Sequence, residues 1–250
     1  MQEYSLSQIK SAYEQKKDWE RQFPVDYFIV RPISFYLTYL IIRITKSPSR
    51  VAWVGFAIGL LGCFSFLFIT HLTIWPGILL LIVFSILDAV DGNIARVTKN
   101  VTYYGKFLDG LFGVLIGGSY CFWLALGLCL NPGSNSQLVI ILAGVSIMTG
   151  RLYGNKFEDT YYIHFISKQK ETGSFQETLT ATIQGSTYRK HWLYLLFINF
   201  QSFNPQLIIL TLCALLNTVH LFLFLLAMYY LSSLLIKMVF YLREAHKKLS

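Results

Sequence analysis

The sequence predicts an all-α membrane protein in which six transmembrane helices follow an interfacial amphipathic helix. Three observations lead to this fold class. The chain of 250 residues is 54% hydrophobic and only 14% charged, whereas soluble domains carry about 25% charged residues. Its apolar segments reach the roughly 20 residues that a helix needs to cross a bilayer. Its basic residues gather on one side of the resulting map, so the net charge of +8 does not indicate a nucleic-acid partner.

Six apolar segments are predicted to span the membrane. They are residues 51–70, 74–96, 105–130, 137–153, 192–216 and 219–242. The fifth segment is interrupted at 201–205 by Gln-Ser-Phe-Asn-Pro. Proline and polar residues inside an apolar helix cause kinks or breaks, so we expect this segment to be bent or broken there.

Residues 26–46 are predicted to form the interfacial helix. Arg31 and Arg43 interrupt its apolar run and leave only eleven residues between them, which is too short to cross a bilayer. Pro32 lies in the first turn, where proline is well tolerated, and helices of this kind lie in the membrane interface. The alternative is a seventh span, which would place the basic stretch 10–21 on the outer side, against the charge distribution.

The distribution of charge predicts the orientation of the chain. The joins at 71–73, 131–136 and 217–218 contain no Lys, Arg, Asp or Glu, and all 21 Lys and Arg residues fall on the opposite side or close to it. Because basic loops face the cytoplasm, we expect a multi-pass integral membrane protein with both termini cytoplasmic. The first twenty-odd residues are polar and lack the apolar stretch of a cleavable signal peptide.

The domain organisation follows from this map. Residues 1–25 form a polar cytoplasmic arm, which is expected to be helical and to end at Pro24. Residues 47–242 form one six-helix domain, within which residues 167–190 are a polar cytoplasmic loop, and residues 243–250 form a cytoplasmic tail. The four cysteines lie in apolar runs without the spacing of metal ligands or of secreted disulfides.

Three aspartates interrupt the apolar segments near their cytoplasmic ends. Asp88 and Asp91 lie near the end of the second span, three residues apart and so on one helix face, and Asp109 lies near the start of the third. Charge at this depth is costly, and converging carboxylates repel one another unless a cation lies among them. The pattern predicts a site for Mg²⁺ or Mn²⁺ that opens to the cytoplasm. The alternative is separate pairing of the aspartates with Arg96 and Lys106.

The residues around these aspartates resemble the signature of the CDP-alcohol phosphotransferases, also called CDP-alcohol phosphatidyltransferases. The signature reads D-x2-D-G-x2-A-R-x8-G-x3-D-x3-D. This chain has D-A-V-D-G-N-I-A-R from Asp88 to Arg96, then eight residues, then G-K-F-L-D from Gly105 to Asp109. Seven of the eight specified positions match with the right spacings. Residues 47–53, S-P-S-R-V-A-W, resemble the family's T-P-N-x-x-T entry to the first span only at Pro48.

The resemblance implies an enzyme that displaces CMP from a CDP-linked donor and moves the remaining substituted phosphate onto an acceptor hydroxyl. It implies that Asp88, Asp91 and Asp109 hold Mg²⁺ or Mn²⁺, with Asp88 and Asp109 as catalytic residues. Bound metal ions would neutralise the pyrophosphate and help CMP leave. The implied nucleotide-binding residues are Asp91, Gly92, Ala95, Arg96 and Gly105. A homodimer would also fit the family.

The last aspartate of the signature falls at position 113, where this chain has Gly113. The resemblance assigns to that acid a share of the second metal ion and the role of general base, whose loss usually costs about 10²–10⁴ in rate.

Three hypotheses stay open. The enzyme is active, because Glu158 or Asp159 supplies the base or because the acceptor oxygen is already ionised. It is a non-catalytic relative that binds metal and nucleotide as a partner or regulatory subunit. Or Gly113 is a laboratory substitution. Gly113 and Gly117 also form a small-xxx-small pair, which favours close helix packing.

Basic residues near the same side are candidates for binding the acceptor. Arg151, with Lys99 and Lys106, can hold an anionic group by charge-assisted hydrogen bonds. Alternatively, Arg151 reaches out to lipid headgroups. The expected partners are a CDP-alcohol or CDP-diacylglycerol donor, a lipid or phosphorylated small-molecule acceptor, and membrane lipids. A transporter is the alternative from another class, but it would need acids spread across the bilayer and an internal repeat, and the sequence shows neither.

Overall fold

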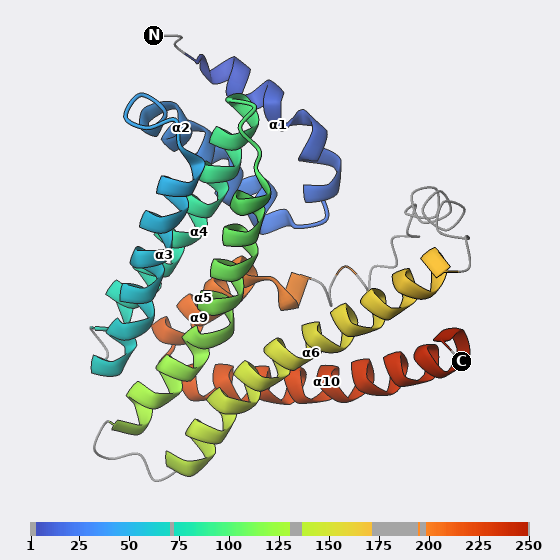
Figure 1. The fold of residues 1–250 in the computed structure, drawn as a ribbon. Coiled ribbons are helices and arrows are strands. Elements are labelled where there is room, and N and C mark those ends of the chain that lie inside the picture. The colour runs from blue at the N-terminus through green and yellow to red at the C-terminus, as the bar shows by residue number, and fades with distance from the viewer. Residues whose placement is uncertain (1–3, 71–72, 131–136, 172–194, 196–198, 250) are drawn as a thin grey trace.

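The fold is all-helical in the ranges that the computed structural model describes, which are residues 4–70, 73–130, 137–171, 195 and 199–249 (Figure 1). Five helices there are long and apolar enough to cross a membrane. They are Pro48–Phe68, Ile74–Val97, Tyr103–Leu130, Gln137–Glu171 and Val219–Leu249. The predicted class, an all-α membrane protein, is confirmed. A further apolar helix, α9 (Phe203–Leu215), has only 13 residues, so the count of six spans stays a prediction.

The N-terminal segment folds as two short helices. α1 (Leu6–Glu20) begins with a capping box built on Ser5, which satisfies backbone amides at the start of the helix. A π-helical turn, η1 (Asp26–Val30), leads into α2 (Arg31–Ile41). At 1.5 Å per residue α2 is about 16 Å long, well short of a bilayer core of about 30 Å. A helix of this length does not span a membrane, as expected for the interfacial segment.

The next two helices pack closely along each other. α3 (Pro48–Ser65) is extended by a 3₁₀ turn, η2 (Phe66–Phe68), and runs along α4 (Ile74–Val97). Glycine makes the approach possible, because a Cβ at Gly59 would lie only 3.1 Å from the ring of Phe84. α1 and α2 pack against α4 as well. The helix that carries two of the aspartates is therefore held from two sides.

α4 ends directly after its polar residues in a Schellman motif. The amide of Asn100 donates to the Ala95 carbonyl (2.9 Å), and the amide of Lys99 donates to the Arg96 carbonyl (3.2 Å). Lys99 adopts a left-handed backbone with φ 55°, a conformation that glycine adopts more readily. This tight turn leads the chain back into α5 (Tyr103–Leu130).

α5 runs through the centre of the packed core. Ile116, Tyr120 and Leu124 on this helix are fully buried. Near the end of α5, Gly127 touches η2 so closely that a Cβ at this position would lie 1.7 Å from the carbonyl oxygen of Phe66. Only glycine fits such a contact with backbone, so this crossing fixes α5 against the end of α3.

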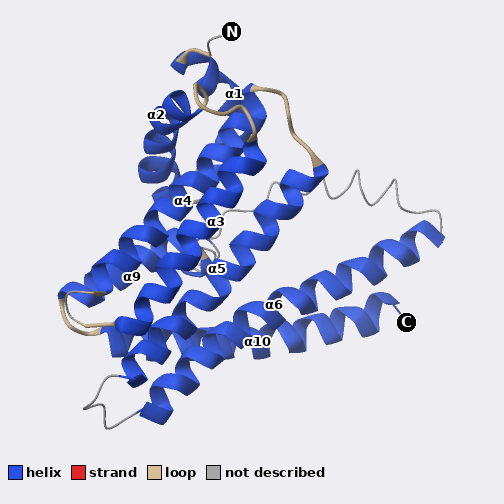
Figure 2. Cartoon of the chain, turned by 60° about the vertical axis from the view of Figure 1, so that its left-hand side comes forward, coloured by secondary structure: helices blue, strands red, loops and turns tan. Residues whose placement is uncertain are grey.

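The last two long helices form a pair that extends away from the others. α6 (Gln137–Glu171) and α10 (Val219–Leu249) lie side by side, at a steep angle to α3 and α4 (Figures 1 and 2). Both continue past the predicted span ends at 153 and 242. Residues 155–171 contain no glycine or proline that would end a helix, and ring contacts such as Tyr161 with Tyr241 (5.4 Å) join the extension of α6 to α10. Most of the predicted loop 167–190 lies outside the described residues.

The predicted interruption at 201–205 is present as a bend at Ser202, after which α9 begins. Asn204 accounts for it through contacts with distant segments. Its Oδ1 accepts a hydrogen bond from the Ser85 hydroxyl (2.5 Å), and its Nδ2 donates to the Asp26 carboxylate. The polar residues in this apolar segment thus join η1, α4 and α9.

Candidate functional site

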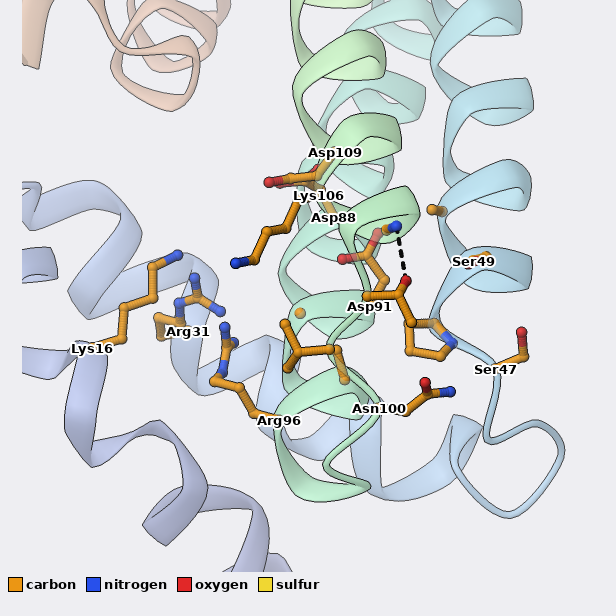
Figure 3. A pocket seen from close by; sticks show the side chains of 17 residues that line it. Lys16, Arg31, Ser47, Ser49, Asp88, Asp91, Arg96, Asn100, Lys106 and Asp109 are labelled. Carbon is orange, nitrogen blue, oxygen red and sulfur yellow. Dashed lines mark hydrogen bonds between the residues drawn. The ribbon is translucent and has the colours of Figure 1, made fainter. Parts of the chain in front are cut away.

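One cavity of about 270 Å³ lies where α3, α4 and α5 meet the N-terminal helices, and all three aspartates border it (Figure 3). α4 contributes five lining residues at helical positions i, i+3, i+4, i+7 and i+8, which fall on one face. They are Asp88, Asp91, Gly92, Ala95 and Arg96. α5 contributes Gly105, Lys106 and Asp109 from its first two turns. The residues of the predicted signature are therefore brought together around a single space.

The carboxylates are close neighbours in this cavity. Asp88 and Asp109 lie within hydrogen-bonding reach of each other, and Asp91 is only 8% exposed. Across the described parts of the chain, no ion pair within 4.0 Å joins any of the three to a basic side chain. The alternative in which Arg96 and Lys106 neutralise them by direct pairing is therefore not seen among these residues.

The donor set fits a hard divalent cation. Carboxylate oxygens are the ligands that Mg²⁺ and Mn²⁺ prefer, and adjacent carboxylates that lack a basic partner are costly without a cation. As they stand, however, no three Asp, Glu, His or Cys side chains in the described ranges are grouped closely enough to hold a metal ion. Mg²⁺ is commonly held by one or two carboxylates and completes its coordination with water and substrate phosphate, so a cluster of three is not needed for this donor set to bind it.

Small residues and one arginine shape the floor of the cavity. The Arg96 guanidinium lies over Gly92, where a Cβ would be 3.2 Å from its Nη2. That Nη2 donates to Asn93 Oδ1 (2.8 Å). Arg96 Nε is buried and has no hydrogen-bond partner among the described residues. Buried N–H groups are normally hydrogen-bonded, so the Arg96 guanidinium, which borders the cavity, is not fully hydrogen-bonded within the described chain.

Gly113 lies one turn beyond Asp109 on α5, outside the cavity lining. A Cβ built there has no described atom within 4 Å, so no packing requirement forces glycine at this position. The small-xxx-small contact proposed for it is not present at Gly113. Of the two candidate replacement bases, Asp159 is exposed on α6 and does not border the cavity. The side chain of Glu158 lies outside the described atoms.

The three acceptor candidates are separated in the structure. Lys106 borders the cavity with the aspartates, whereas Lys99 forms the turn after α4 and does not. Arg151 borders a second cavity of about 280 Å³. Its Nη1 donates to Gln206 Oε1 (3.2 Å), and its Nη2 lies 3.0 Å from where a Cβ of Gly117 would be. Arg151 therefore reaches α5 two turns beyond Asp109.

Several lining residues were not predicted from the sequence. They are Lys16, Arg31, Ser47, Pro48, Ser49, Ala52, Asn100, Val101 and Thr102. The weak similarity of residues 47–53 to the family's entry motif was a signal for the residues at the start of α3. Arg31 itself was noticeable in the sequence, because it interrupts the apolar run of the interfacial segment. Nothing local in the sequence distinguished Lys16 from the other lysines of α1.

A buried polar network connects the N-terminal helices to α4. Glu20, 2% exposed, accepts hydrogen bonds from Tyr13 Oη (2.6 Å) and Arg31 Nε (2.6 Å). Arg31 Nη1 donates to the Ala89 carbonyl and to Asn93 Oδ1, both at 3.3 Å. Burial alone would raise the pKa of Glu20, but the hydrogen bond and charge of Arg31 bring that pKa below its ordinary value.

Comparison with known proteins agrees with the signature. Residues 48–156 match the sequence profile of a family described as CDP-alcohol phosphatidyltransferase. The archaetidylinositol phosphate synthase of Pyrococcus horikoshii is 38% identical to this chain over 81 residues, which cover 32% of this chain and 42% of that relative. The similarity thus spans less than half of the relative's length.

Proposed function

We propose that the chain is an integral membrane transferase of the CDP-alcohol phosphatidyltransferase family, whose sequence profile residues 48–156 match. It moves a substituted phosphate from a CDP-linked donor to an acceptor and releases CMP. The observation that carries the proposal is the gathering of the signature residues of α4 and α5 around one cavity. Their spacing in the sequence and their common position in the fold support the same site.

The aspartates are the proposed metal ligands. Asp88, Asp91 and Asp109 would hold Mg²⁺ or Mn²⁺, which when bound supplies positive charge to the pyrophosphate and assists departure of CMP. Like-charge repulsion among these neighbouring carboxylates favours cation uptake as the donor enters. Asp88 and Asp109 face each other across the two helices, so they bring the reacting phosphate between α4 and α5.

The nucleotide lies, in this proposal, against the α4 face. Ala95 has a small side chain and borders the space proposed for the cytidine ring and ribose, and at Gly92 the Arg96 guanidinium lies against the backbone. The Arg96 guanidinium borders this space and is proposed to form a charge-assisted hydrogen bond with a phosphate oxygen. Gly105, at the start of α5, borders the same space.

The acceptor is proposed to enter along α5 from the side of Arg151. Eight residues separate Asp109 from Gly117, which corresponds to about 12 Å along the helix. An acceptor that binds an anionic group at Arg151 can therefore present an oxygen near Asp109, with Lys106 beside it. The relative is by name a synthase of an inositol phosphate lipid, which supports a phosphorylated polar acceptor. Lys99 lies outside the cavity and is the weakest of the three candidates.

Acceptor activation sets this chain apart from the signature. In the transfer, an acceptor oxygen forms a bond to the substituted phosphorus, the bond from that phosphorus to CMP breaks, and a hydroxyl acceptor loses its proton. Gly113 cannot accept that proton. An acceptor that attacks through an ionised oxygen, such as a phosphate or carboxylate, needs no base at this position.

A second candidate function is supported by the same glycine. With no carboxylate at 113, and neither Asp159 nor any other described acid replacing it at the cavity, the chain can serve as a non-catalytic partner. Such a protein would bind metal and CDP-linked ligand and regulate another subunit. The two functions share the binding site and differ in turnover.

Release of CMP distinguishes the two functions. The purified chain is supplied with CDP-linked donors, with Mg²⁺ or Mn²⁺, and with hydroxyl, phosphorylated and carboxylate acceptors in parallel. CMP production that depends on an added acceptor supports the transferase. Binding of the donor without CMP from any acceptor supports the non-catalytic partner, and failure to bind any CDP-linked ligand contradicts both.

A further inference from the structure

The N-terminal helices contribute to the cavity although they precede the family-matched segment, which begins at residue 48. Lys16 of α1 and Arg31 of α2 border the same space as the aspartates of α4 and α5. In Figure 3 the charged ends of Lys16, Arg31, Arg96 and Lys106 extend toward one region beside the carboxylates. The cavity thus has an acidic side and a basic side.

The basic side of the cavity is preorganised, because hydrogen bonds hold Arg31 in place. Its guanidinium is paired with the buried Glu20 and donates to the Ala89 carbonyl and Asn93 Oδ1 of α4. Removing these two charges from water is costly, and several hydrogen bonds are needed to offset the cost. With at least four of its five N–H groups engaged, Arg31 acts as a positioning residue.

Lys16 differs from Arg31 in having free donor capacity. Its Nζ lies 3.1 Å from Glu20 Oε1, and its side chain is 40% exposed. Its Nζ also lies 5.5 Å from the centre of the Trp19 ring. An ammonium group has three N–H donors, so donor capacity is left for a ligand. The neighbouring Lys17 points elsewhere: its Nζ lies 3.0 Å from Glu14, and it borders a different hollow, between α1 and α2.

The balance of charge on the basic side indicates an anionic ligand. Four cationic side chains meet there, and Glu20 is the acid that pairs with two of them. Converging like charges are unfavourable unless negative charge lies near them. The aspartates across the cavity supply such charge, but a metal ion held by them would neutralise it, and an anion would then be needed beside the four cations. Arg96 borders the same space, and its guanidinium is not fully hydrogen-bonded, since its Nε has no partner within the described chain.

We propose that Lys16 binds a phosphate oxygen of the CDP-linked ligand and that the Glu20–Arg31 pair positions it, so that the N-terminal arm forms part of the nucleotide site. The inference rests on the proposed function, because the phosphates in question are those of the donor. It extends the site beyond residues 48–156 to helix α1. Lys16 is the direct ligand contact, and the two partners act through it.

The test measures binding of CDP, with Mg²⁺ present, to the full-length purified chain. CDP carries the cytidine and the two phosphates of a CDP-linked donor. Lys16→Gln should raise the dissociation constant for CDP about tenfold, the usual scale for a lost charge-assisted hydrogen bond. Cytidine, which has no phosphate, should bind both proteins equally. Lys16→Arg should retain most of the affinity, because it keeps the charge.

Lys17→Gln is the matched control, since it removes the same charge one residue away on the same helix. Its dissociation constant for CDP should stay within about twofold of the unsubstituted value. If CDP binds the unsubstituted chain and Lys16→Gln binds it equally well, the inference is wrong while the proposed function stands. The inference is also wrong if Lys16→Gln weakens cytidine as much as CDP. If the unsubstituted chain does not bind CDP, the proposed function itself fails.

Discussion

Arg31 Nη1 of α2 lies 3.3 Å from Oδ1 of Asn93 on α4, and this hydrogen bond ties the N-terminal segment to the helix that carries Asp88 and Asp91. Asn93 is 2% exposed and also receives a hydrogen bond from Arg96. One side-chain oxygen therefore holds both the anchor of the arm and an arginine of the cavity. Changes in the arm are expected to reach the cavity through this oxygen.

Docking of α1 is predicted to depend on pH through Glu20. Because the folded-state pKa of Glu20 lies below its ordinary value of 4.5, its stabilising contribution is complete above that value and is lost as pH falls through the folded-state pKa. The protection factors of the amides of Leu6–Glu20, which are the intrinsic exchange rates at each pH divided by the observed rates, should therefore decrease in acid. Glu20→Gln should lower these protection factors at neutral pH and reduce their dependence on pH.

Glu14→Gln is the control, because Glu14 pairs with Lys17 at the exposed surface of the same helix. It should exchange like the unsubstituted chain at every pH. Asp26, whose pKa is raised by burial and also by the charge of Glu20, titrates in all three proteins, so a smaller acid response is expected to persist in Glu20→Gln. An unchanged acid response in Glu20→Gln would show that the buried pair does not control docking.

The crossing of α5 over η2 is predicted to reject any side chain at Gly127. A methyl group there would overlap the Phe66 carbonyl, so Gly127→Ala should lower the free energy of unfolding by about 1–3 kcal/mol or more. Gly110→Ala, on the same helix, meets no described atom within 4 Å and should stabilise by up to about 1 kcal/mol through helix propensity. The thermal unfolding midpoints of the two variants and the unsubstituted chain are measured in the same detergent. A midpoint of Gly127→Ala equal to that of Gly110→Ala would contradict the close crossing.

A carboxylate at position 113 is predicted to increase transfer to a hydroxyl acceptor. Gly113→Asp has open space, so its thermal midpoint should stay close to that of the unsubstituted chain. The rate of CMP release should rise by about 10²–10⁴, the usual contribution of a general base. Gly113→Asn matches the size without the basic oxygen. Should Asn accelerate release as much as Asp, the base would not be what this chain lacks.

The orientation of the chain is predicted from its charges alone. A reporter fused at residue 134 should be extracytoplasmic and one fused at residue 178 cytoplasmic, because the join 131–136 has no charged residue and the stretch 151–190 is rich in Lys and Arg. Each position is fused in turn to a reporter that is active only in the cytoplasm and to one that is active only outside it, and the two activities show on which side the position lies. The reverse pattern would move the cavity to the other face of the membrane.

Local signals accounted for most of the helical segments and for the pattern of lining residues on α4. The length of an apolar run depends only on neighbouring residues, which is why α4 begins at Ile74, as predicted, and ends one residue beyond 96. Helix geometry likewise sets which residues between Asp88 and Arg96 share a face. Both kinds of information are contained in short stretches of chain.

The features that the sequence did not predict depend on contacts between distant segments. The 35 residues of α6 are helical well past 153, and their partner is α10. The start of α9 is joined through Asn204 to Asp26 and Ser85. Lys16 reaches the cavity because α1 folds back onto α4 through Glu20 and Arg31. The pattern of apolar residues within α1 does not indicate that α1 docks on α4.

The most direct test of the account is equilibrium binding of CDP as a function of Mg²⁺, compared between the unsubstituted chain, Asp88→Ala and Asp109→Ala. The account predicts that Mg²⁺ strengthens binding to the unsubstituted chain and that this strengthening disappears in both variants, because each loses a carboxylate that faces the other across the cavity. Mg²⁺-dependent binding that persists unchanged in both variants would contradict the assignment of the metal site.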